Sequence, residues 1–202
     1  SGEGSSAAFK MFGWRYVNII SQALIYLGEI PDYQSINKHI LSMDGLFVRF
    51  AKAYFNNKQV VDLSKKLESL AAAIDHKMLP AAIRGRDNEA IAIMQLYDME
   101  SLQDPIFDGL LSSFRADKTY YDKVVSNMTP LLEQLNTGRT TELLAPDYYD
   151  LEDPREIFDW KSVIEQDAVV YVGLDCLTDS IVGGAVGASM FSDLTSTLGS
   201  IY

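Results

Sequence analysis

The chain has 202 residues, of which 48% are hydrophobic, and a formal net charge of −11 at pH 7. This hydrophobic content is enough for one large core, or for one core and part of a second, and it argues against disorder along the whole chain. Because 28 Asp and Glu outnumber 17 Lys and Arg, the composition argues against a surface built mainly to bind nucleic-acid phosphates.

Thiols and imidazoles are scarce. Cys176 is the one cysteine of the sequence, so no internal disulfide can form and an oxidising compartment is not implied. His39 and His76 lie far apart without a nearby cysteine, which excludes a zinc site of ordinary spacing. No stretch approaches the ~20 apolar residues of a membrane span, and no signal-peptide pattern opens the chain. We therefore expect a soluble, cytoplasmic chain without a bound metal.

Helical periodicity follows a flexible opening of residues 1–6. Apolar residues recur every three or four positions from Ala8, and Gly28 favours the end of this first helix. Asp32 restarts the chain, and we expect Asp44 to be the N-cap of a further helix. The period in the first four helices is carried by Phe9, Phe12, Tyr16, Ile19, Ile20, Ala23 and Leu27, by Ile36, Ile40 and Leu41, by Leu46, Phe47, Phe50 and Phe55, and by Leu63, Leu67, Leu70 and Ile74.

A turn and two caps organise the helices that follow. The turn Arg84–Asp87 interrupts the period, which then resumes. Asp104 followed by Pro105 marks a helix start, because a carboxylate cap precedes a proline at the first helical position. Asp117 is expected to cap the next helix, which Pro130 should kink or split. The inward residues of these helices are Ile91, Met94 and Tyr97, and then Tyr121, Val124, Met128, Leu131 and Leu135.

The pattern changes towards the C-terminus. An acidic connector over residues 146–154 and a short helix precede the continuous apolar run 168–174, which is typical of a strand buried on both faces of a parallel sheet. A last helix over residues 180–198 carries glycines that would allow close approach to a sheet. The strand's partners are expected outside this chain. The expected fold is therefore mainly α, with a helical-bundle domain over residues 1–157 and one buried β-strand plus a helix over residues 158–202, part of an incomplete α/β domain.

Neither common phosphate-binding pattern is present. No Gly-Lys-Ser/Thr occurs, and the glycines near Gly183 and Gly187 lie inside a helix rather than in a turn, so we interpret them as packing positions. Asp175 directly follows the expected strand, at the edge where α/β proteins bind ligands. It could contact a nucleotide or a metal-bound water in a complete protein; the interpretation we favour is a polar residue that satisfies the turn. Cys176 is interpreted as a small packing residue.

Two clusters of basic residues are candidates for contact with phosphates or with a partner protein. Lys77, Arg84 and Arg86 form the denser cluster, and Lys118 and Lys123 lie beside tyrosines in the segment Asp117–Lys123. The interpretation we favour is that the first cluster is a solvated turn and that the second is a solvated face of a helix. The aromatic stripes keep helical spacing, which predicts core packing rather than stacking on nucleic-acid bases.

Seven segments together resemble the TraD-type coupling proteins of integrating conjugative elements, a branch of the coupling ATPases of type IV secretion. The likeness spans nearly the whole chain in colinear order. The segments are Phe12–Asn18, Gly85–Asp87, Asp117–Lys123, Leu143–Tyr148, Ile157–Trp160, Val170–Asp175 and Gly187–Leu194.

The resemblance implies a membrane-anchored, hexameric P-loop ATPase that uses ATP and Mg²⁺ and brings a relaxase–DNA complex to the secretion channel. It implies that residues 1–157 are an all-helical insertion in a RecA-like motor, and that residues 158–202 are a strand and helix of that motor. Walker A and Walker B are missing, so the fragment is expected to be inactive alone and no catalytic residue or cofactor is assigned to it.

The implied partners are relaxase, other relaxosome proteins and further motor subunits, with DNA in the full assembly. The implied place is the cytoplasmic side of the bacterial inner membrane, with the membrane reached through segments missing here. The fragment itself is expected to be a monomer or weak dimer.

Two alternatives remain open. The first is a free-standing helical adaptor with no motor. The second is a small enzyme that uses Asp175, Asp179 and the acidic connector around a divalent cation, although the connector lacks the ligand spacing of an EF-hand.

Overall fold

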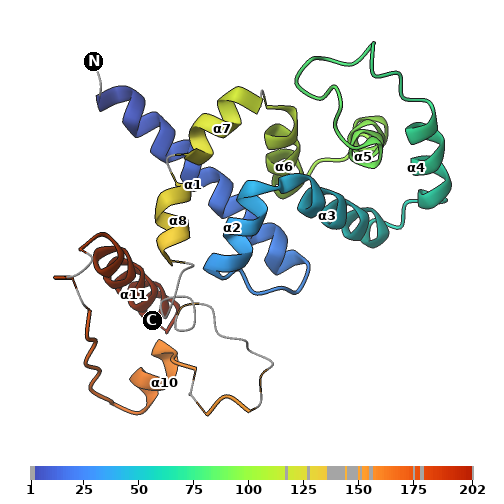
Figure 1. The fold of residues 1–202 in the computed structure, drawn as a ribbon. Helices are drawn as coiled ribbons and strands as arrows, with labels where there is room; N and C mark the ends of the chain where they lie inside the picture. Colours follow the sequence, from blue (N-terminus) through green and yellow to red (C-terminus); the bar gives the residue numbers. More distant parts are fainter. Residues whose placement is uncertain are drawn as a thin grey trace. The chain divides into compact units, whose positions relative to one another are not determined.

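The computed structural model describes residues 3–116, 118–126, 128–135, 144, 150, 152–154, 157–174, 176–177 and 180–201, with side chains from Gly13 onward except those of Lys118, Tyr120 and Leu131. These residues are mainly helical, as expected, and they contain no strand (Figure 1). The helices are α1 (Glu3–Tyr26), α2 (Tyr33–Leu41), α3 (Met43–Asn57), α4 (Leu63–Ala72), α5 (Asn88–Met99), α6 (Pro105–Arg115), α7 (Lys118–Ser126), α8 (Thr129–Leu135), α10 (Trp160–Glu165) and α11 (Ser180–Ile201).

The chain divides into two compact units, Ser1–Leu132 and Glu133–Tyr202. The domains expected from the sequence, 1–157 and 158–202, have their boundary at a different residue, and that division stays a prediction.

Several helix boundaries follow from local side-chain chemistry. The carboxylate of Asp32 accepts from the backbone N–H of Ser35 (2.7 Å), and Asp104 caps α6 by accepting from two backbone N–H groups, with Pro105 at the start of the helix. Gly28 adopts a φ of 76°, the left-handed conformation that commonly follows a helix. The cap expected at Asp44 is wrong, because Ser42 occupies the N-cap position of α3 and Asp44 lies in its first turn.

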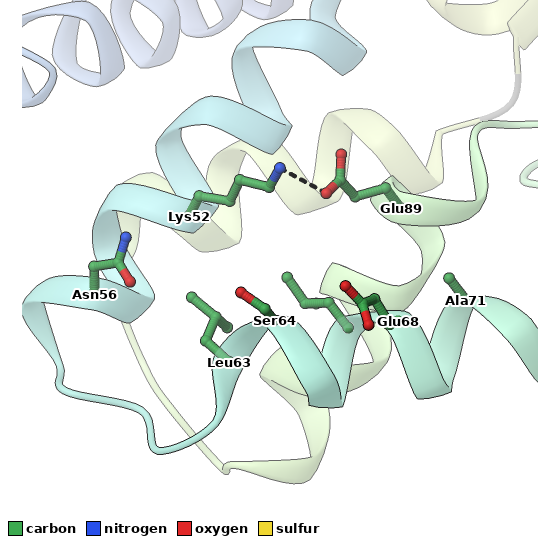
Figure 2. A pocket seen from close by; sticks show the side chains of 8 residues that line it. Lys52, Asn56, Leu63, Ser64, Glu68, Ala71 and Glu89 are labelled. Atoms are coloured by element: carbon green, nitrogen blue, oxygen red, sulfur yellow. Dashed lines mark ion pairs between the residues drawn. The ribbon is translucent and has the colours of Figure 1, made fainter.

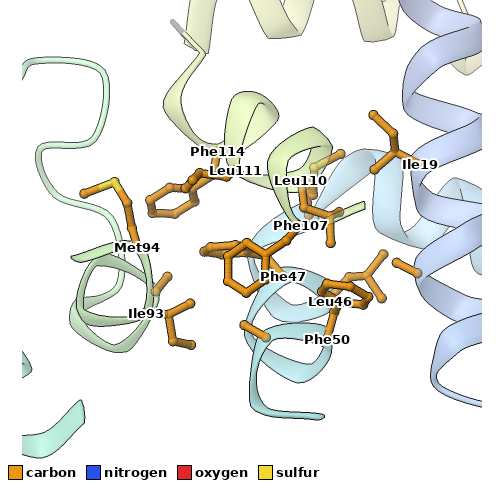
Figure 3. Close-up of a cluster of buried hydrophobic side chains, with 14 of the residues drawn as sticks. Ile19, Leu46, Phe47, Phe50, Ile93, Met94, Phe107, Leu110, Leu111 and Phe114 are labelled. Atoms are coloured by element: carbon orange, nitrogen blue, oxygen red, sulfur yellow. The ribbon is translucent and has the colours of Figure 1, made fainter. Parts of the chain in front are cut away.

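The core of the first unit is built around aromatic rings from α3, α5 and α6. Figure 3 shows rings of α3 and α6 packed among apolar side chains that include Ile19 of α1 and Ile93 and Met94 of α5. Phe107 is fully buried at its centre, and the ring of Tyr97 stacks on it with centroids 3.8 Å apart. Phe47 meets Phe107 edge-on at 5.7 Å. Such stacked and edge-on pairs contribute beyond the area that they bury. The aromatic stripes are therefore core, as their spacing predicts.

Two tyrosine hydroxyls satisfy buried polar groups around this core. The Tyr97 hydroxyl donates to the carboxylate of Asp108 (2.8 Å) and accepts from the backbone N–H of Asp104 (2.9 Å). Burial, followed by the hydrogen bond to Asp108, raises the pKa of Tyr97. The Tyr121 hydroxyl donates to the backbone carbonyl of Ile40 (2.6 Å) and joins α7 to α2. Because both hydroxyls are hydrogen-bonded, burying these rings leaves no polar atom unpaired.

The second unit holds two helices and the apolar run between them. Trp160 of α10 donates its indole N–H to the backbone carbonyl of Met190 in α11 (3.1 Å). Residues 168–174 form an extended segment with no strand partner in the described part of the chain (Figure 1). Val169 is 98% and Tyr171 95% exposed. The structure thus shows no buried strand here, and the sheet that would bury one was expected outside this chain.

Gly109 and Gly45 provide a matched test of the helix packing. A Cβ added at Gly109 would lie 2.6 Å from Cδ1 and 2.9 Å from Cγ1 of buried Ile19, so α1 and α6 pack too closely there for a side chain. We expect Gly109→Ala to lower the free energy of unfolding by about 1–3 kcal/mol. Gly45→Ala, in an exposed helical position with nothing within 4 Å, should raise it by up to ~1 kcal/mol. Urea denaturation measures both, and equal effects would contradict this packing.

His39 predicts a pH dependence of stability. Its side chain is buried and its Nδ1 has no hydrogen-bond partner among the described residues. Burial, and then the charges of Arg49 and Lys38, lower its pKa below the ordinary 6.5. The unfolded chain therefore binds a proton at His39 at a higher pH than the folded chain does. The folded state keeps its full stability with respect to His39 above pH 6.5, and it loses stability as the pH falls below 6.5.

Urea denaturation at roughly pH 8 and pH 5 should show a smaller acid-induced loss of stability in His39→Gln than in the unsubstituted chain. An equal loss in both proteins would show that His39 does not couple protonation to folding.

Candidate functional site

Arg86 is engaged inside the first unit. Its Nη1 lies 2.6 Å from a carboxylate oxygen of Asp44, and its guanidinium carbon lies 4.9 Å from the ring centroid of Phe114. The Arg86 side chain is 23% exposed. The residue thus ties the turn before α5 to both α3 and α6, and its charge is already compensated by the chain itself.

The other two residues of the denser basic cluster lie on the surface of the same loop. Arg84 donates to the backbone carbonyl of Leu79 (3.0 Å), and Lys77 is exposed. His76 holds this loop: its Nε2 lies 2.7 Å from Oδ1 of Asn88, and its Nδ1 accepts from the backbone N–H of Gly85 (3.2 Å). The structure therefore brings Lys77, Arg84 and Arg86 into one loop but leaves two of them facing solvent.

The remaining candidates are placed only in part. Lys123 is exposed on α7. The backbone of Lys118 begins that helix, while its side chain lies outside the described residues. Asp175 and Asp179 also lie outside the described residues, so their suggested roles stay predictions.

Ion pairs within the chain occupy several of its cations. In the part of the chain that the structure describes, such pairs join Arg49 to Glu29, Lys52 to Glu89, Lys66 to Glu100, Arg86 to Asp44, and Arg115 to Asp98. Each pair removes one cation from those available to phosphates. Because the chain carries an excess of carboxylates, the surface that remains favours cationic partners.

The first unit has a groove of about 380 Å³, bordered by α3, α4 and the start of α5 (Figure 2). Apolar side chains of α4 line one wall, and Lys52 of α3 faces Glu89 of α5 across the opposite rim. The groove is lined by Lys52, Asn56, Leu63, Ser64, Leu67, Glu68, Ala71 and Glu89.

The rim of this groove is charged and open to water. Nζ of Lys52 lies 2.6 Å from Oε1 of Glu89, and each side chain is 45% exposed. Glu68 is exposed, and none of the ion pairs among the described residues includes it. An exposed pair of this kind contributes little to stability, so its carboxylate can be shared with another cation at small cost.

Sequence patterns do not reveal the groove. The period of α4 predicts Lys65, Lys66 and Glu68 on its outer face. Periodicity separates an inner from an outer face, but it does not say which neighbouring helix stands beside the outer one. Glu89 follows the Asp87 cap of α5 and is paired with Lys52 only in the folded chain.

Two features are absent from the residues that the structure describes. No group of three or more His, Cys, Asp or Glu residues that could hold a metal ion occurs among them. Likewise, none of the helices described in the structure is both long enough and apolar enough to cross a membrane. The groove contains no histidine or cysteine.

The role of Arg86 can be tested by stability. Replacement by Ala removes the ion pair and the ring contact together, and it should lower the free energy of unfolding by roughly 1–2 kcal/mol. Arg86→Lys keeps the charge but not the planar group over Phe114, so its free energy of unfolding should lie between those of the unsubstituted chain and Arg86→Ala. Lys77→Ala is the control, with a change within about 0.5 kcal/mol. Equal effects of Arg86→Ala and Lys77→Ala in urea denaturation would contradict the structural role of Arg86.

Comparisons with known proteins give no relative. No protein-family model matches the chain, and neither a curated protein nor a solved structure does. The resemblance to coupling proteins therefore rests on the seven segments quoted above.

Proposed function

We propose that this chain is the helical recognition domain of a conjugative DNA-transfer coupling ATPase, followed by one strand and one helix of its RecA-like motor. One observation carries the proposal: the second unit exposes an apolar surface that a self-sufficient domain would bury. Its exposed large hydrophobic residues are Ile157, Phe158, Val169, Tyr171, Val172, Leu174, Leu177, Ile181, Phe191, Leu198 and Ile201.

Helix α11 shows this most clearly. Among its residues, Ser180–Ile201, only Gly183 is buried and only Asp193 is charged. A surface helix normally presents charged residues to water, and a helix without them is normally covered. Each Å² of apolar surface left in water forgoes roughly 25 cal/mol of burial free energy. In the proposed protein, an element from outside the described residues covers the apolar surface of α11.

The extended segment 168–174 also exposes apolar side chains that a neighbouring element would bury. Its β-branched and aromatic residues suit a strand inside a sheet, yet its backbone has no ladder partner in the described residues. Two of the segments that carry the resemblance, Val170–Asp175 and Gly187–Leu194, coincide with this exposed run and with α11. A parallel motor sheet with helices on its faces would bury both.

The first unit fits a recognition role. It closes its own core and pairs several of its own cations, and it keeps an acid-rimmed groove. In the proposed assembly the excess carboxylates attract basic relaxosome proteins or relaxase on the cytoplasmic side of the inner membrane. ATP and Mg²⁺ act in parts of the motor outside this chain.

A helical adaptor without a motor is the alternative function. It is favoured by the core of the first unit, a continuous hydrophobic cluster to which α1 to α8 contribute. In that case a partner protein, rather than a motor sheet, covers α11.

The test is to read the frame around this segment and to compare hydrogen exchange in the encoded protein and in this chain. We expect a Gly-Lys-Ser/Thr loop upstream and an apolar strand ending in Asp-Glu downstream. Amides of residues 168–174 should exchange rapidly in the isolated chain and become protected in the full protein, because ladder hydrogen bonds form there.

An open reading frame without those motifs would contradict the assignment of this chain to a motor protein. Unchanged exchange of residues 168–174 in a protein that does carry them would show that this segment is not a motor strand.

A further inference from the structure

We propose that the groove between α3 and α4 binds a basic amphipathic helix of a partner protein, with an apolar side chain on its floor and a Lys or Arg at Glu68 and Glu89. The inference rests on the proposed function in one respect only, that partner recognition is the role of the first unit. It adds the place of recognition and the chemistry of the partner.

The shape of the groove accommodates side chains. Leu67 is buried at its floor, and the half-buried Leu63 and Ala71 extend this apolar surface along α4. The volume of about 380 Å³ lies at the lower end of the range for specific binding pockets. It suits anchoring side chains of a segment that lies across the opening, rather than an entire enclosed ligand.

The charges of the groove select for a cation. Lys52 is its one cationic lining residue, against the two carboxylates of Glu68 and Glu89. Lys52 and Glu89 already form a pair (Figure 2), and none of the ion pairs among the described residues includes Glu68. A partner Lys or Arg placed over the groove would pair with Glu68 and approach Glu89. A phosphate in the same place would meet both carboxylates, so the groove favours protein over nucleic acid.

The walls of the groove favour a helix over an extended peptide. An extended peptide gains much of its affinity by adding to a sheet edge, and the described part of this chain has no strand. A helix satisfies its own backbone groups and needs only side-chain contacts from α3 and α4. Asn56 and Ser64, which line the groove, add neutral donors and acceptors for polar groups of the partner.

Contacts within the first unit hold the walls of the groove in place. α4 packs mainly on α5, and Lys66 joins it to Glu100 at the end of α5 (2.6 Å). The turn from α3 to α4 places Gln59 and Asp62 at φ values of 55° and 54°, which turn the chain sharply before α4 begins. Because the walls are fixed in advance, binding need not order them first.

The probe is a synthetic amphipathic helix of roughly 18 residues, long enough to be helical, with Leu on one face and Lys on the other. A second peptide with Glu in place of Lys is the charge control. Fluorescence anisotropy of the labelled peptides measures binding to this chain. We expect the Lys peptide to bind and the Glu peptide not to bind.

Three variants locate the site. Glu68→Lys should weaken binding of the Lys peptide about tenfold or more, because a carboxylate that lines the groove becomes a repelling cation. Asp122→Lys, an equal charge change at an exposed position of α7 outside the groove, should change it by no more than about threefold. Ser64→Trp fills the groove without changing charge and should also weaken binding. Circular dichroism confirms that each variant is folded.

Three results would overturn the inference: equal losses in Glu68→Lys and Asp122→Lys, unchanged binding to Ser64→Trp, or equal binding of the Glu peptide. Displacement of the Lys peptide by single-stranded DNA that binds in the groove would also overturn it. None of these results bears on the exchange of residues 168–174, so failure here is distinct from failure of the motor assignment.

Discussion

The ring of Phe107 holds the first unit together. Tyr97 of α5 stacks on one face of it at 3.8 Å, while Phe47, Phe50, Tyr54 and Phe55 of α3 approach at centroid distances between 5.3 and 5.9 Å. One residue of α6 therefore touches two other helices through their aromatic side chains. Since interiors are close-packed, moving Phe107 would require moving all of these rings. The relative positions of α3, α5 and α6 follow from this constraint.

The groove is a consequence of the same packing. With α3 and α5 fixed by the aromatic cluster, α4 lies beside α5 and buries only Leu67 among its residues. α4 therefore does not close the space against α3, and Lys52, Glu68 and Glu89 border what remains. A larger apolar face on α4 would have filled this space. The candidate site thus lies where the core stops, which is where binding residues on a rigid scaffold commonly occur.

Local chemistry could be predicted from the sequence and long-range pairing could not. The caps at Asp32 and Asp104 depend on backbone N–H groups two or three residues away, so their residue types indicate them. Asp44 has the same residue type, but its carboxylate binds Arg86, 42 positions away. That pairing arises only when α3, α6 and the turn before α5 meet. The groove could not be predicted for the same reason, because its rim joins residues of separate helices.

The two units differ in the kind of surface that they offer to a partner. In the first unit the core is closed and the groove rim carries carboxylates, so association there gains from charge and weakens as salt screens it. In the second unit α11 has one charged residue and a largely exposed apolar surface, so association there gains from removing apolar area from water, which salt does not screen. A partner held by charge can exchange while an apolar cover stays in place. Under the proposed function, such a difference would let the domain stay attached to a motor while it docks successive basic proteins.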